Sequence, residues 1–146
     1  MCLYLDYTYH GFLVAEKDIK CYKLLIKKDG EYYTYFREEK IDFNKGQKIE
    51  NFDPIESIES NIEDYDGEES FVSSTITSGA IHSFRDFDVT KREVLSSYKI
   101  SNQTIAFAEC TIPKGAYYID GYDFFMCDAY CSSELKYDKI IYEESL

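Results

Sequence analysis

The sequence predicts a single domain of the α+β class, mostly antiparallel sheet with two inserted helices. The chain has 146 residues, a length typical of one domain. Its fifteen tyrosines and ten phenylalanines are residue types that strands favour. Several strand-like runs are interrupted by two segments that carry helix-start signals. We therefore expect one domain over residues 1–146, with an acidic helical insertion at residues 50–70.

The clearest strand signal is a β-hairpin near the N-terminus. Two runs rich in strand-forming residues, 20–27 and 31–36, flank Asp29 and Gly30. An Asp-Gly pair adopts the positive φ angles of a tight hairpin turn, so these two runs are expected to pair. Residues 103–112, QTIAFAECTI, are largely apolar and form the expected central strand. Other strands are expected at residues 3–9, 71–77, 116–119 and 137–144, with a short one between residues 41 and 50.

The first expected helix lies in the acidic segment after residue 50. Asp53 is its cap, Pro54 occupies the first helical position, and Glu56 can reach back in a capping box. Gly67 is the expected C-terminal cap. Apolar residues between these ends recur at helical spacing and form one stripe: Ile55, Ile58, Ile62 and Tyr65.

The second expected helix lies within residues 85–99, RDFDVTKREVLSSYK. Asp86, Asp88 or Thr90 could cap its N-terminus, because short polar side chains accept hydrogen bonds from free backbone amides. Glu93 follows three residues after Thr90, as in a capping box. The sequence leaves the choice between these caps open.

The balance of charge limits the kind of partner that the protein can bind. Twenty-eight acidic residues against sixteen basic ones give a net charge of −12. Binding to the phosphate backbone requires Lys and Arg, so no direct nucleic-acid binding is expected. A positively charged protein surface is a better match. The apolar runs are too short to cross a membrane, so no membrane partner is expected.

The cysteines and the N-terminus indicate the compartment. The five cysteines are an odd number, and the opening MCLYLDYTYHGF lacks the pattern of a signal peptide. We therefore expect free thiols and a cytoplasmic location. Cys127 and Cys131 are close in sequence, but buried thiols are the default interpretation. A zinc site would need further ligands brought in by the fold: Cys2, Cys21, Cys110 or His82. No phosphate loop, nucleophile elbow or HExxH motif occurs, and no cofactor or metal is expected.

The strongest functional signal is an acidic cluster that contains no basic residue between Lys48 and Arg85. Like charges spaced three or four apart on a helix destabilise it by about 0.2–0.5 kcal/mol per pair. Three interpretations remain open: a solvated face, a surface that imitates nucleic acid, and a calcium loop at DYDGEES, whose spacing departs from that of an EF-hand. The expected partner-binding residues are Glu50, Asp53, Glu56, Glu59, Glu63, Asp64, Tyr65, Asp66, Glu68 and Glu69.

Several motifs resemble those of a family of small uncharacterised proteins from phages, prophages and gut bacteria. The motifs are the opening MCLYLDYTYHG, the HSF at residues 82–84, the IPKG at residues 112–115, and a later Tyr, Ser and terminal strand. The resemblance implies no established activity, and the acidic middle of this chain looks like an insertion relative to that family. The segment IPKGAYYI with the later Glu134 is also similar to ADP-ribosyltransferase-like folds, although the Glu-x-Glu pattern is missing.

The leading hypothesis is a phage-type inhibitory binding protein with an anti-CRISPR-like role. It would occlude a positively charged, nucleic-acid-binding surface of a host defence protein, with carboxylates in place of phosphates. The alternative is an ADP-ribosyltransferase-like or other small enzyme or nucleotide-binding domain that uses His82, Tyr117 and Glu134. A structural or regulatory domain with a merely soluble surface is a third possibility.

Overall fold

The structure is a computed structural model that describes most of the chain. It describes residues 3–5, 11–35, 37–54, 59–65, 68–76, 80–97, 103–123 and 127–145. For residues 4, 5, 59–65, 68–76 and 97 it describes the backbone alone.

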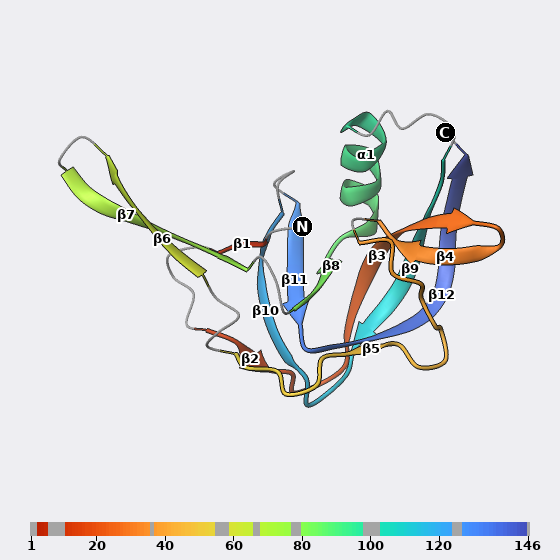
Figure 1. The fold of residues 1–146 in the computed structure, drawn as a ribbon, viewed down its shortest axis with the longest axis horizontal. Helices are drawn as coiled ribbons and strands as arrows, with labels where there is room; N and C mark the ends of the chain where they lie inside the picture. Colours follow the sequence, from red (N-terminus) through yellow and green to blue (C-terminus); the bar gives the residue numbers. More distant parts are fainter. Residues whose placement is uncertain are drawn as a thin grey trace.

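The described residues form one antiparallel sheet of twelve strands and one helix (Figure 1). The strand order is β5-β12-β9-β3-β8-β11-β10-β1-β7-β6, with β2 paired to β10 and β4 paired to β3. The elements are β1 (Leu3–Leu5), β2 (Leu13–Val14), β3 (Ile19–Lys28), β4 (Glu31–Thr34), β5 (Gln47–Lys48), β6 (Glu59–Tyr65), β7 (Glu68–Ile76), β8 (Ile81–Phe84), α1 (Phe87–Ser97), β9 (Thr104–Ile112), β10 (Tyr117–Tyr122), β11 (Asp128–Ser132) and β12 (Glu134–Ser145).

The expected α+β class with two inserted helices is therefore wrong. Most of the described residues lie in strands, and α1 is the one helix among them. The first expected helix is replaced by strand, since residues 59–65 form β6 and pair with β7. Residues 55–58, where that helix was expected to begin its apolar stripe, lie outside the described residues.

The predicted N-terminal hairpin is confirmed as β3 and β4. Leu25 pairs with Thr34 and Lys28 with Glu31, which leaves two residues in the turn. These are Asp29 at φ 50° and Gly30 at φ 78°, the pair of positive angles that the turn requires.

The strand predicted at residues 103–112 is confirmed as β9, but it is an interior strand between β12 and β3, third from one end of the strand order, and not the central one. Its alternate residues belong to two separate cores. Ile105 and Phe107 face one core, and Ala106 and Ala108 belong to the other, all fully buried. Burial on both faces explains why the strand reads as a continuous apolar run rather than an alternating one.

The predicted second helix is confirmed as α1, and the structure resolves which residue caps it. The Oδ1 atom of Asp86 accepts a hydrogen bond from the Val89 amide at 3.1 Å. The helix packs against the first core, where the Phe87 and Phe107 ring centroids lie 5.5 Å apart. This contact between aromatic rings packs α1 against β9.

The loop between β4 and β5 covers the second core. Ile41 is buried there, and the rings of Phe43 and Tyr137 lie 5.7 Å apart. The Tyr137 hydroxyl donates a hydrogen bond to Gln47 Oε1 at 2.7 Å, which ties the predicted short strand β5 to β12. This covering segment forms one wall of a pocket described below.

Candidate functional site

The acidic cluster lies in a hairpin that extends away from the rest of the molecule (Figure 1). We call this hairpin, β6 with β7, the acidic arm. At its base, residues 74–76 of β7 pair with β1, while Glu59 and Ser60 pair with β7 from the other side. Beyond Asn61 and Ser73 the two strands pair only with each other among the described strands.

Most of the negative charge lies in the outer part of the arm. Glu63 pairs with Phe71, and Tyr65 pairs with Glu68, with a register shift between these two pairs. Asp64 and Glu69 lie within the same short stretch, and neither strand contains Lys or Arg. The structure therefore concentrates carboxylate-bearing residues at the end of the arm.

The other expected partner-binding residues are only partly described. Glu50 and Asp53 are exposed and precede the arm in the chain. Glu56 and Asp66 lie outside the described residues. The pairing of β6 with β7 thus places six of the expected residues on one hairpin: Glu59, Glu63, Asp64, Tyr65, Glu68 and Glu69.

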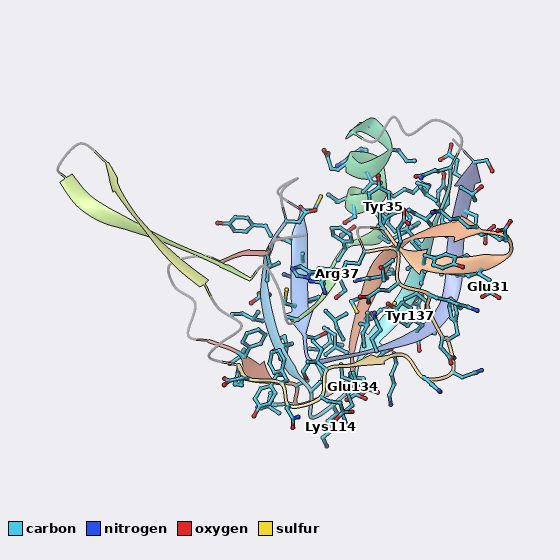
Figure 2. The ribbon with its side chains drawn as sticks, viewed as in Figure 1. Glu31, Tyr35, Arg37, Lys114, Glu134 and Tyr137 are labelled. Atoms are coloured by element: carbon cyan, nitrogen blue, oxygen red, sulfur yellow. The ribbon has the colours of Figure 1, made fainter. Side chains whose placement is uncertain are left out.

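A second feature, which we call the cationic pocket, lies between the sheet and the segment that leads from β4 to β5. Its volume is about 460 Å³. The lining residues come from four parts of the chain: Lys23 and Leu24 of β3; Thr34, Tyr35, Arg37 and Glu39; Gly46, Gln47, Lys48 and Ile49; and Ala80, Ile81, His82 and Phe84. Figure 2 labels Tyr35 and Arg37, which follow the end of β4.

Lys23 and His82 connect two walls of this pocket. The half-buried Lys23 donates a hydrogen bond from Nζ to the backbone carbonyl of His82, which is itself buried in β8. Burial lowers the pKa of the Lys23 amine, and electrostatic interactions with Cys110, Cys131, Cys21 and Glu39, in that order, oppose the shift. An anion next to this amine would therefore favour its charged form.

Local hydrogen bonds fix the loop that carries Arg37. The Thr34 amide donates to the Glu39 carbonyl at 2.8 Å, and the Glu39 amide donates to the Thr34 hydroxyl at 3.0 Å. Glu38 has a φ angle of 52°, which turns the chain back toward β4. The loop thus presents Arg37 from a closed turn rather than from an extended strand.

Of the three residues of the alternative enzyme hypothesis, His82 alone lines the cationic pocket, whereas Tyr117 and Glu134 are not among its lining residues. Tyr117 and Ser133 exchange hydrogen bonds, and the neighbouring Glu134, labelled in Figure 2, pairs with Lys48 of β5. Tyr117 stacks with Phe52, with ring centroids 5.7 Å apart.

The cysteines of the described residues are buried and make no disulfide: Cys21, Cys110, Cys127 and Cys131. Cys21 and Cys110 are cross-strand neighbours on β3 and β9. Within the described part of the chain, no three His, Cys, Asp or Glu side chains are grouped so that they could hold a metal ion. The four thiols therefore belong to the core of the sheet.

Alkylation should show how inaccessible these thiols are. Burial raises the pKa of Cys21 from 9.0 to about 11 and also raises the pKa of Cys110. Thiolate is the reactive form, so a shift of two units lowers its fraction about a hundredfold near pH 8. Iodoacetamide should modify Cys21 and Cys110 at least about a hundredfold more slowly in the native protein than in guanidinium, as followed by peptide mass spectrometry. Equal rates in the two states would contradict the buried placement.

Among the described residues, no helix has the length and apolar character needed to span a membrane. Comparison of the chain with family models, curated proteins and solved structures found no match. The functional argument therefore rests on the acidic arm and the cationic pocket.

The sequence indicated the acidic cluster, though as a helix, and did not indicate the pocket. A run without Lys or Arg is visible in one stretch of sequence, whereas Lys23, Arg37 and Lys48 are far apart in the chain. His82 was the one pocket residue singled out from the sequence. The pairing of β3 with β8 and the return of the chain through β5 create the rest of the pocket.

Proposed function

We propose that this protein binds and occludes a positively charged, nucleic-acid-binding surface of another protein. In this proposal it is a phage-type, anti-CRISPR-like inhibitor that acts in the host cytoplasm, and the acidic arm makes the decisive contact. The observation that carries the proposal is the hairpin itself, a projecting element with five acidic residues and no basic one.

The density of charge at the outer end of the arm is close to that of nucleic acid. Two or three successive residue positions along the hairpin contain four acidic residues: Glu63, Asp64, Glu68 and Glu69. At about 3.4 Å per step this is one carboxylate for every 2–3 Å or so. Duplex DNA carries one phosphate charge per about 1.7 Å of its axis. A groove that accepts a phosphate backbone therefore meets a comparable field on the arm.

The shape of the arm also suits insertion into a groove. A two-stranded hairpin is narrow, and β6 forms the end of the strand order. Edge strands invite pairing with other chains, and acidic residues along such an edge disfavour pairing between copies of this protein. The same charge favours approach to a basic surface, so the arm discriminates in favour of the proposed class of partner.

The mechanism requires no chemical step. The arm would occupy the positive groove, and the body of the sheet would block access to its surroundings. Because the attraction is electrostatic, association should be fast at low salt and should weaken as salt rises. The exposed residues Glu50 and Asp53, which precede the arm in the chain, would add to the negative charge available to the partner.

Neutralising the arm tests the proposal. The variant E59Q/E63Q/E68Q/E69Q removes four charges from the arm, and the control E16Q/D29N/D120N/D128N removes four charges from exposed positions elsewhere. Wild-type protein is immobilised, partners are captured from bacterial lysate at low and high salt, and the captured protein is then assayed for binding to labelled nucleic acid. We expect wild type and control to displace the nucleic acid, and the arm variant to do so at least about tenfold less well at low salt.

Two results would contradict the proposal. One is displacement by the arm variant with the same concentration dependence as wild type. The other is capture of a partner that does not bind nucleic acid, by wild type and both variants alike. Circular dichroism of the three proteins confirms that the sheet is retained, so that loss of binding is not loss of fold.

A further inference from the structure

The cationic pocket has the opposite charge to the molecule that contains it. Across the whole chain acidic residues outnumber basic ones by 28 to 16. Among the pocket-lining residues the balance is reversed, with Lys23, Arg37 and Lys48 against the single carboxylate of Glu39. An acidic protein that concentrates cations in one cavity has a surface for a negatively charged ligand.

We propose that the cationic pocket binds a small organic anion, a phosphate monoester or a carboxylate attached to an apolar body. This site is independent of the acidic arm, since none of its lining residues belongs to β6 or β7. The ligand proposed for the pocket is negatively charged, so the acidic arm would repel it.

The cations of the pocket are available to such a ligand. Within the described part of the chain, neither Arg37 nor Lys48 makes a side-chain ion pair or hydrogen bond. Other lysines on the same sheet do have carboxylate partners, such as Lys20 with Glu109 at 3.4 Å and Lys28 with Glu38 at 3.3 Å. Charged groups that this acidic chain leaves unpaired at a cavity are ready to accept an external anion.

Lys23 lies at the inner part of the site, where an anion would favour the charged form of its amine. Its amine donates to a backbone carbonyl, which orients the group without neutralising it. Because the residue is half-buried, an anion placed beside the amine is poorly screened by water. Arg37 contributes a planar guanidinium, which can bind the two oxygens of a carboxylate or phosphate at once.

The remaining lining defines the rest of the ligand. Leu24, Ile49, Ile81 and Phe84 provide apolar surface, and Tyr35 provides an aromatic ring. A volume of about 460 Å³ lies within the range of sites that hold small organic molecules. A bare inorganic ion would leave most of this cavity and its apolar wall unused, so an anionic head with an apolar body is the better match.

Calorimetric titration of the full-length protein tests the assignment. The probes are phenyl phosphate, benzoate, inorganic phosphate and neutral benzyl alcohol. We expect phenyl phosphate, benzoate or both to bind, and the tighter one identifies the head group. Inorganic phosphate should bind more weakly than phenyl phosphate, and benzyl alcohol should give no saturable signal.

A pair of charge variants locates the binding. R37Q/K48Q removes the two unpaired cations of the pocket, and R92Q/K139Q removes one Arg and one Lys from exposed positions on α1 and β12. The pocket variant should bind the organic anion at least about tenfold more weakly, while the control should bind as wild type does. All four exchanged residues are exposed, so the fold is retained, which thermal melting verifies.

The inference is overturned if neither organic anion binds, or if the two variants bind equally well. Inorganic phosphate binding as tightly as phenyl phosphate would overturn the assignment of an organic ligand. These outcomes are separable from failure of the arm, because the E59Q/E63Q/E68Q/E69Q variant leaves every pocket residue unchanged.

Discussion

Replacing Phe107 with alanine should lower the free energy of unfolding by about 3–5 kcal/mol. Phe107 is fully buried at the centre of β9. Its ring centroid lies 5.5 Å from that of Phe87 on α1 and 6.3 Å from that of Tyr142 on β12. The substitution removes the ring contacts with Phe87 and Tyr142. It also leaves a cavity that β9, paired on both edges, cannot easily close.

Denaturation in guanidinium chloride, followed by circular dichroism, measures this loss. Phe107→Leu keeps most of the volume and should cost less than the alanine change. Val89→Ala is the surface control, because Val89 is 39% exposed on α1, the helix that packs on Phe107, and it should change stability by no more than about 0.5 kcal/mol. A Phe107→Ala protein within 1 kcal/mol or so of wild type would show that α1 does not pack on β9 as described.

The elements that were predicted correctly have strong local signals. The Asp29-Gly30 turn allows positive φ angles at both positions, and the flanking runs favour strands. The β9 run is too apolar to face water on either side, so its burial on both faces follows from composition alone. In α1, the polar residue before the first turn is the cap.

The wrong helix prediction shows where local signals compete. Ile55, Ile58, Ile62 and Tyr65 recur at helical spacing, yet isoleucine and tyrosine also favour strands. A helix would have placed Glu59 and Glu63 one turn apart, where like charges repel. In the hairpin Glu63 pairs with Phe71, and Tyr65 pairs with Glu68, so no acidic residue faces another in these pairs.

The decisive contribution to the hairpin comes from elsewhere in the chain. Residues 71–76 are a strand-like run that includes Phe71, Val72 and Ile76, and residues 74–76 of this run pair with β1 on one side. Its other edge is then open to β6, and pairing satisfies the backbone hydrogen bonds of both segments. Periodicity within residues 53–67 contains no information about this tertiary partner, so the sequence pattern alone favoured the helix.

The Gly46→Ala substitution should destabilise the protein more than the same change at Gly30, by about 1–3 kcal/mol. Both glycines have positive φ angles, 67° at Gly46 and 78° at Gly30, so an alanine is strained at either position. A Cβ atom at Gly46 would lie 2.5 Å from the Leu135 backbone oxygen, whereas at Gly30 it would meet nothing within 4 Å. Gly30→Ala therefore measures the conformational strain alone, and the difference between the variants measures the steric contact.

The contact at Gly46 connects stability to the cationic pocket. Leu135 pairs with Gln47 of β5, so a displaced carbonyl would disturb the strand that positions Lys48. The Ile49 amide, which donates to the Ser133 carbonyl at 2.9 Å, should exchange its hydrogen faster in Gly46→Ala than in Gly30→Ala. Denaturant unfolding and hydrogen exchange of the two variants measure both effects. Equal stability and equal exchange at Ile49 would mean that the backbone of Gly46 does not lie against β12.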